Sequence, residues 1–156
     1  MIFAVTGTQL PFDRLIRILD EMAPLLQEEI VAQVNVGAYL PRHLHTVDLL
    51  PPDEFDRIFS RARLIVAHAG IGTILTALQQ QKPIIIFPRI AALGEHRNEH
   101  QLATAAKMKE AGWVYVAETK EELAALLLTP DLPPLCTIGN GASGSLVESI
   151  TDFILQ

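Results

Sequence analysis

The chain has 156 residues, of which 49% are hydrophobic, and its 18 acidic and 12 basic side chains give a formal net charge of −6. This length suits one well-cored domain, and the apolar content excludes a disordered chain. The acidic balance argues against a nucleic-acid binder, which would need a basic face. The single cysteine, Cys136, excludes an internal disulfide and fits a reducing compartment, and we expect it to be partly buried.

The first half of the chain alternates short apolar runs with amphipathic segments. We expect a strand at 2–5, a helix from about Pro11, a strand at 30–34, a loop at 37–52 with a short strand near 47–49, and a helix from 51 through 59. The apolar face of the first helix comprises Phe12, Leu15, Ile16, Leu19 and Met22.

The second half continues the alternation. We expect strands at 63–67, 84–87 and 113–116, and helices at 71–80, 96–111 and 121–128. A passage rich in proline and glycine at 130–144 precedes a final helix at 145–155. The chain is then a single domain, 1–156, with its core in about residues 1–128. The longest apolar runs are too short for a membrane span, and the amino terminus lacks the basic region of a signal peptide, so we expect a cytoplasmic protein.

Strands that alternate with helices predict an α/β fold: an open, Rossmann-like parallel sheet with helices on both faces. In such sheets ligands bind outside the carboxyl ends of the strands. The turns at Gly7, Gly70 and Pro88 each follow a predicted strand, so we expect them to converge at that edge.

The turn at 67–73 is the strongest local signal for a ligand. Gly70 and Gly72 open a helix directly after an apolar strand, where the backbone can approach an anion and the helix start presents unpaired N–H groups. Thr73, in the first turn, could reach a phosphate oxygen or cap the helix. A plain tight turn remains the alternative, and a lone histidine at a strand end, such as His68, is usually structural.

Three further motifs have two interpretations each. Arg89 follows the strand at 84–87 and is either a phosphate fork or a solvated side chain. The segment 139–144 matches G-x-G-x-x-G, but it follows Pro133-Pro134 instead of a strand, which favours a loop. His96 and His100 fit the H-x-x-E-H pattern of zinc peptidases on one helix face, but we see no further ligand and expect no metal.

Taken together, these motifs resemble the carboxyl-terminal, donor-binding half of the family 28 glycosyltransferases, which have the GT-B fold. The resemblance covers residues 3–118 and is greatest to short stand-alone members, such as the catalytic subunit of the dolichol-linked N-acetylglucosaminyltransferase and bacterial exopolysaccharide-synthesis subunits. The motifs that carry it are Thr6-Gly7-Thr8 with 11–15, the turn at 68–73, Lys82-Pro83 with Pro88-Arg89, and 94–96 through His100-Gln101.

The resemblance implies a UDP-sugar as donor substrate and no other cofactor. The pyrophosphate would lie over the helix start at 70–73, Ile71 included, with His68 beside it. His100 and Gln101 would lie near the sugar or distal phosphate together with His96, and Gly7 and Thr8 would line the cleft. GT-B enzymes place the acceptor site in an amino-terminal domain. We therefore expect a membrane-anchored partner subunit to supply that half and a lipid-linked acceptor, holding this chain at the inner face of the membrane.

One position departs from the family pattern. The family usually carries a glutamate three residues after Thr73, where its carboxylate accepts hydrogen bonds from both ribose hydroxyls, and this chain has Thr76 there. Loss of one charge-assisted bond costs about 1.5–3 kcal/mol, or roughly ten- to hundredfold in affinity. Gln79 or Gln80 could compensate. The alternative function is a non-catalytic nucleotide-sugar-binding or regulatory subunit.

Overall fold

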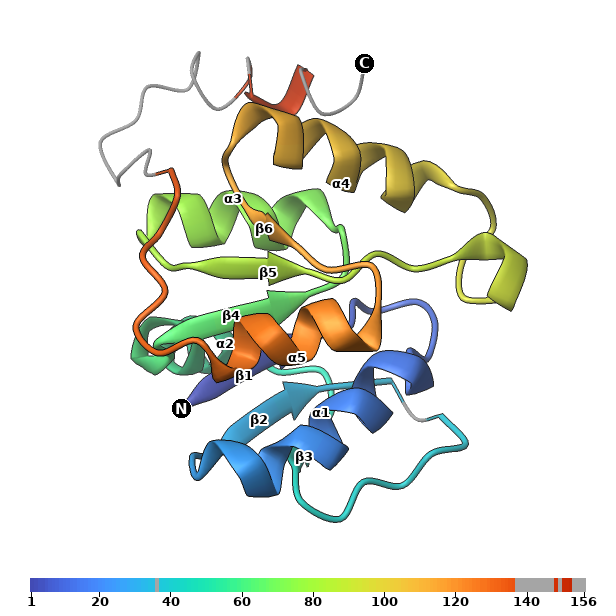
Figure 1. Ribbon diagram of the computed structural model, residues 1–156, viewed down its shortest axis with the longest axis vertical. Helices are drawn as coiled ribbons and strands as arrows, with labels where there is room; N and C mark the ends of the chain where they lie inside the picture. Colours follow the sequence, from blue (N-terminus) through green and yellow to red (C-terminus); the bar gives the residue numbers. More distant parts are fainter. Residues whose placement is uncertain (36, 137–147, 149, 153–156) are drawn as a thin grey trace.

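The predicted parallel sheet is confirmed by a computed structural model that describes residues 1–35, 37–136, 148 and 150–152 (Figure 1). Its six strands all run parallel in the order β3-β2-β1-β4-β5-β6. Their bounds are β1 Ile2–Val5, β2 Ile30–Gln33, β3 His45–Val47, β4 Leu64–Ala67, β5 Ile84–Ile86 and β6 Tyr115–Val116.

Helices cover both faces of the sheet, as predicted (Figure 1). One face packs against α1 (Asp13–Leu26) and α5 (Lys120–Leu128), and the other against α2 (Pro52–Arg61), α3 (Ile71–Gln79) and α4 (His100–Ala111). Alternate strand residues enter the two cores, because successive side chains of a strand point to opposite faces: Ile2 and Ala4 join the α1 side, Phe3 and Val5 the α2 side.

The strand order opens a crevice at one edge of the sheet. The chain runs from β1 outward to β2 and β3, and then crosses back to β4 on the other side of β1. The connections after β1 and β4 therefore leave the sheet in opposite directions, which opens a crevice at the carboxyl ends of these two strands. The loop after β1 and the turn before α3 border that crevice.

Two aspartates of α1 fasten the loop between β2 and β3. Asp13 accepts a hydrogen bond from the backbone N–H of Tyr39 at 3.3 Å. Asp20 is buried and accepts from the Tyr39 hydroxyl at 2.6 Å and from the N–H groups of Arg42 and His43 at 3.0 and 2.7 Å. Burial by itself raises the pKa of Asp20, but these hydrogen bonds outweigh it and leave the pKa below its ordinary value.

The second half shows small departures from the predicted elements. The prediction that α4 begins at His96 was wrong by about one turn: the helix begins at His100, after a short 3₁₀ helix, Ala91–Leu93. The Asn98 side chain accepts a hydrogen bond from the N–H of His100 at 2.9 Å, so residues before it form a turn. β6 has only two residues. In the first half, the short strand lies at 45–47 instead of 47–49.

The carboxyl-terminal predictions lie largely outside the described residues. This holds for the glycine motif at 139–144 and for most of the helix predicted at 145–155, of which residues 148 and 150–152 are described as helical. Cys136 is half-buried, as expected, and burial raises the pKa of its thiol. None of the helices within the described ranges is long and apolar enough to cross a membrane.

Candidate functional site

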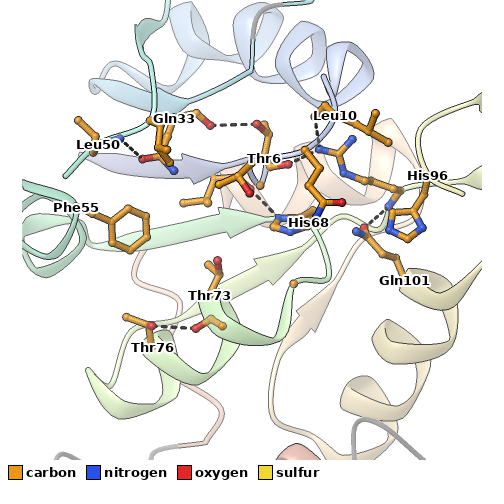
Figure 2. A pocket seen from close by; sticks show the side chains of 18 of the residues that line it. Thr6, Leu10, Gln33, Leu50, Phe55, His68, Thr73, Thr76, His96 and Gln101 are labelled. Atoms are coloured by element: carbon orange, nitrogen blue, oxygen red, sulfur yellow. Dashed lines mark hydrogen bonds between the residues drawn. The ribbon is translucent and has the colours of Figure 1, made fainter. Parts of the chain in front are cut away.

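A cleft of about 970 Å³ opens at the carboxyl edge of the sheet, where the sequence placed the site (Figure 2). It lies between the loops that follow β1, β4 and β5. All predicted site residues except Ile71 and His100 line it, namely Gly7, Thr8, His68, Gly70, Gly72, Thr73, Thr76, Arg89, His96 and Gln101. The structure thus brings together segments that are up to 94 residues apart in the chain, Gly7 and Gln101.

The start of α3 forms one wall of the cleft. No side chain in the described part of the protein caps this helix, so the N–H groups of its first turn are available to a ligand. No atom of the residues that the structure describes lies within 4 Å of the position that a Cβ would occupy on Gly72, which leaves room for an anion against the backbone. An uncapped helix start of this kind attracts phosphate through its N–H groups and its dipole.

A neighbouring side chain, and not a ligand, explains why position 70 is a glycine. A Cβ on Gly70 would lie 2.4 Å from His68 Nε2, and one on Gly7 would lie 3.0 Å from the same atom. The imidazole ring therefore sits between the two glycine turns. Gly7 also has φ +84°, a conformation that side chains disfavour. Of the two glycines that suggested a phosphate site, Gly72 alone faces open space.

The surroundings of His68 set its protonation state. Its Nδ1 lies 3.3 Å from the carbonyl oxygen of Val5, which can only accept, so Nδ1 carries the proton of the neutral ring. Burial lowers the pKa of His68 to about 4, and the charges of Arg89 and His96 act in the same direction. His68 is therefore neutral near pH 7 and acts as a wedge between the two loops.

Arg89 joins the loops around the cleft by hydrogen bonds to their backbone carbonyl oxygens. Its guanidinium is buried and donates to the carbonyl oxygens of Leu10, Pro11 and Glu95 at 2.7, 2.8 and 3.1 Å, and also to that of Thr6. Both terminal nitrogens are engaged, so a bidentate phosphate fork would require these bonds to break. The structure corrects both sequence interpretations: Arg89 is neither solvated nor free to grip a phosphate, although its charge lies beside the cleft.

The carboxylate of Glu95 adds further hydrogen bonds between these loops. It accepts two hydrogen bonds from Arg14 on α1, at 2.7 and 2.9 Å, and a third from the N–H of Ile90 at 2.8 Å. Arg14 also donates to the carbonyl oxygen of Pro88 at 3.0 Å. The loops after β1 and β5 are thereby fixed to each other and to α1, so this side of the cleft is preformed.

Gln101, at the start of α4, has a similar positioning role. Its side-chain carbonyl accepts from the N–H of Arg89 at 3.0 Å and from that of Ala69 at 3.4 Å. The amide nitrogen makes no hydrogen bond with any described residue, and the side chain borders the cleft, so this group is available to a ligand. The expected role near a sugar or phosphate remains a prediction.

The two histidines of the H-x-x-E-H match are separated by the turn before α4. His96 lines the mouth of the cleft beside Arg97 and Asn98, and its ring contacts the Asn98 backbone, whereas His100 begins the helix away from the cleft. The shared helix face that we expected is therefore absent. Within the described ranges, no group of three or more His, Cys, Asp or Glu side chains could hold a metal ion.

Sequence reasoning missed the opposite wall of the cleft. This wall consists of Leu49, Leu50, Pro52, Phe55 and Asp56, from the end of the loop after β3 and the first turns of α2. The side chain of Gln33 holds it in place by accepting from the N–H of Leu50 at 3.0 Å (Figure 2). Proline and leucine in a predicted loop carry no signal for binding, and only the sheet topology brings them opposite α3.

Thr76 lines the cleft, but its hydroxyl is engaged within its own helix. It donates to the carbonyl oxygen of Gly72 at 2.9 Å. Gln80, a candidate to compensate for the missing glutamate, instead accepts a hydrogen bond from Ser60 of α2 at 3.0 Å. That bond joins the carboxyl-terminal ends of α2 and α3, away from the cleft.

Comparison with known proteins identifies the class to which this fold and cleft belong. Residues 1–136 match the model of the glycosyltransferase family 28 C-terminal domain, and the chain belongs to this family. The all-parallel sheet and its crevice correspond to one half of a GT-B glycosyltransferase, as the sequence predicted.

The relatives include a subunit of a sugar transferase. The chain is 37% identical over 78 residues to the UDP-N-acetylglucosamine transferase subunit ALG13 of Eremothecium gossypii. That match covers 44% of this chain and 38% of the relative, so the chain spans less than half of the relative's length.

Similar solved structures support the fold. The solution structure of ALG13 has a TM-score of 0.62 at 20% identity and covers 96% of this chain and 93% of that one. MurG of Acinetobacter baumannii gives a TM-score of 0.55 at 22% identity, over 97% of this chain and 49% of that one. At these identities the likeness establishes the architecture.

Proposed function

We propose that this protein is the donor-binding subunit of a glycosyltransferase. It binds a UDP-sugar and, with a membrane-anchored subunit that holds a lipid-linked acceptor, transfers the sugar in the synthesis of a glycolipid or an exopolysaccharide. The observation that carries the proposal is the uncapped start of α3, which faces a preformed cleft beside the unfilled space at Gly72. Family membership and the similarity to a UDP-N-acetylglucosamine transferase subunit support it.

The cleft offers a place for each part of such a donor. The diphosphate suits the α3 start, because the helix dipole and free N–H groups favour an anion there. The apolar surfaces of Leu50 and Phe55 suit a nucleobase. The free amide of Gln101 and the neighbouring His96 lie at the end where the sugar would project.

The transfer step places charge where the protein can stabilise it. As the bond from the sugar to the diphosphate breaks, negative charge grows on the leaving diphosphate, and the α3 N–H groups and the nearby Arg89 charge stabilise it. An inverting transfer also needs a base for the acceptor's proton. His68 does not suit this role, because burial lowers its pKa to about 4 and leaves the neutral ring a weak base near pH 7. We assign the base to the partner subunit.

Calorimetric titration with UDP and UDP-sugars tests donor binding. A matched pair of variants locates the site: Gly72→Asp places a carboxylate in the unfilled space and should abolish UDP binding, whereas the similarly sized Gly72→Asn should retain more of it. Equal affinities for the two variants would contradict a diphosphate at α3. The purified chain alone should transfer no sugar, and robust transfer without a partner would refute the subunit model.

A non-catalytic binding or regulatory subunit is the second candidate. The Thr76 hydroxyl favours this function, because it already donates to the Gly72 carbonyl oxygen and can accept fewer hydrogen bonds from a ribose than a carboxylate can. UDP binding together with a failure to transfer sugar, even with the acceptor-binding partner present, would support this second function.

A further inference from the structure

The wall opposite α3 carries a carboxylate that the fold does not use. Asp56, on α2, is exposed and lines the cleft, and it forms no hydrogen bond or ion pair with any described residue. Asp56 is the one acidic side chain among the described residues that line the cleft. The nearby Glu95 and Glu99 are engaged, since Glu95 accepts from Arg14 and Glu99 from the N–H of Ala92. Asp56 is therefore a polar group in the cleft without a structural role.

The packing of α2 against α3 places Asp56 opposite Thr76. The hydrogen bond from Ser60 to Gln80 joins the two helices near their carboxyl-terminal ends. Both helices run from the carboxyl edge of the sheet toward its amino edge, so they are roughly parallel. Asp56 precedes Ser60 by four residues and Thr76 precedes Gln80 by four. One helical turn nearer the cleft, Asp56 and Thr76 therefore occupy neighbouring positions on the two helices, and both line the cleft.

The surroundings of Asp56 indicate the ligand chemistry that it would meet. On its own helix lies Phe55, which belongs to the apolar wall, and across the cleft lie Thr73 and the start of α3 (Figure 2). In a nucleoside diphosphate, the ribose connects a flat apolar base to the charged diphosphate. A carboxylate between an apolar wall and an anion site is thus placed to accept hydrogen bonds from a vicinal diol.

We propose that Asp56 binds the 2′- and 3′-hydroxyls of the donor's ribose and makes the site specific for a ribonucleotide. This inference rests on the proposed function. The carboxylate comes from α2, across the cleft from Thr76 on α3, and α3 itself has no acidic residue. A carboxylate here repels the diphosphate but can accept hydrogen bonds from the neutral ribose hydroxyls, so the ribose is the part of the donor that Asp56 can bind.

The test compares UDP, 2′-deoxy-UDP and inorganic pyrophosphate by calorimetry. The intact protein should bind UDP about tenfold or more tightly than 2′-deoxy-UDP, since charge-assisted bonds to the diol are lost. Asp56→Asn should weaken UDP binding about ten- to hundredfold and reduce the preference for UDP. Its affinity for pyrophosphate should be unchanged or higher, because a like charge is removed. Asp53→Asn, an exposed change on the same helix but outside the cleft, is the control and should behave as the unmodified protein.

The outcomes separate this inference from the proposed function. If the unmodified protein binds neither UDP nor pyrophosphate, the proposed function fails and the role of Asp56 fails with it. If it binds UDP and Asp56→Asn leaves affinity and preference unchanged, or tightens UDP binding, the role of Asp56 alone is refuted.

A carboxylate moved to the opposite wall gives an independent check. Thr76→Glu should restore UDP affinity in the Asp56→Asn background. In the unmodified protein the same change should add little, since two carboxylates would then face each other. An equal gain in both backgrounds would show that the two positions act independently and would overturn the assignment.

Discussion

The close approach of the His68 ring to Gly70 predicts how much a side chain at position 70 would lower the free energy of unfolding. The change is Gly70→Ala. The backbone at this position has φ −86° and ψ 127°, which alanine adopts without strain, so the added methyl group acts only through its contacts. Those contacts are 2.4 Å to Nε2 and 2.7 Å to Cε1 of His68, whereas ordinary van der Waals contact begins at 3.4 Å.

The expected cost follows from these distances. Overpacking of this kind costs about 1–3 kcal/mol, while replacing glycine by alanine returns roughly 0.4–1 kcal/mol through the unfolded chain. Gly70→Ala should therefore lower the free energy of unfolding by about 1–2 kcal/mol. In a His68→Ala background the clash is absent, so the same change should cost nothing or stabilise the protein slightly.

Urea denaturation followed by the fluorescence of Trp113, the single tryptophan, measures this double-mutant cycle. Gly72→Ala is the control: nothing lies within 4 Å of its added methyl group, and it should raise stability by roughly 0.5–1 kcal/mol while weakening UDP binding. The reasoning is refuted if Gly70→Ala costs the same with and without the His68 ring.

Three further predictions concern the buried polar groups. Arg89→Lys keeps the charge but cannot hold the same set of carbonyl oxygens, so it should lower the free energy of unfolding by about 2–4 kcal/mol in urea denaturation, whereas the exposed Arg57→Lys should have no effect. Asp20→Asn should destabilise the protein by about 1–3 kcal/mol at pH 7; because the folded-state pKa of Asp20 is lowered, the difference should narrow as the pH falls below its ordinary value of 3.8. The pKa of His68 falls from 6.5 to about 4 on folding, so the unfolded chain binds more protons than the folded protein between these pH values. Between pH 7.5 and pH 5 the free energy of unfolding should therefore fall by about 2 kcal/mol more in the unmodified protein than in His68→Ala. A constant difference across pH would contradict either assignment.

Several features of this protein were determined by the sequence alone. Short apolar runs that alternate with amphipathic helices predicted the parallel sheet, and the turns after 2–5, 64–67 and 84–86 predicted the edge where the cleft lies. These signals are local, since periodicity and turn residues act within one element. Motif similarity added the family, although the binding of a donor by these residues stays a prediction.

Only the tertiary structure decided which partner each side chain has. The helix predicted from His96 begins at His100, because the His100 N–H donates to the Asn98 side chain and not to a backbone carbonyl one turn earlier. A sequence pattern does not reveal such a bond. Arg89, Gln101 and His68 follow strand ends or begin a helix, as ligand-binding residues do. Their contacts nevertheless fix neighbouring loops, and this distinction depends on chain segments that are distant in sequence.

The opposite wall of the cleft shows the same limit. Leu50, Phe55 and Asp56 have no sequence signature of binding, because they reach the cleft only where the crossover from β3 to β4 lays α2 beside α3. The sequence predicted a phosphate site at the glycine turn, 70–72, and phosphate binding there stays a prediction. The structure explains its two glycines differently: a side chain on Gly70 would clash with the His68 ring, whereas Gly72 faces open space. Only the packing of distant chain segments shows this difference.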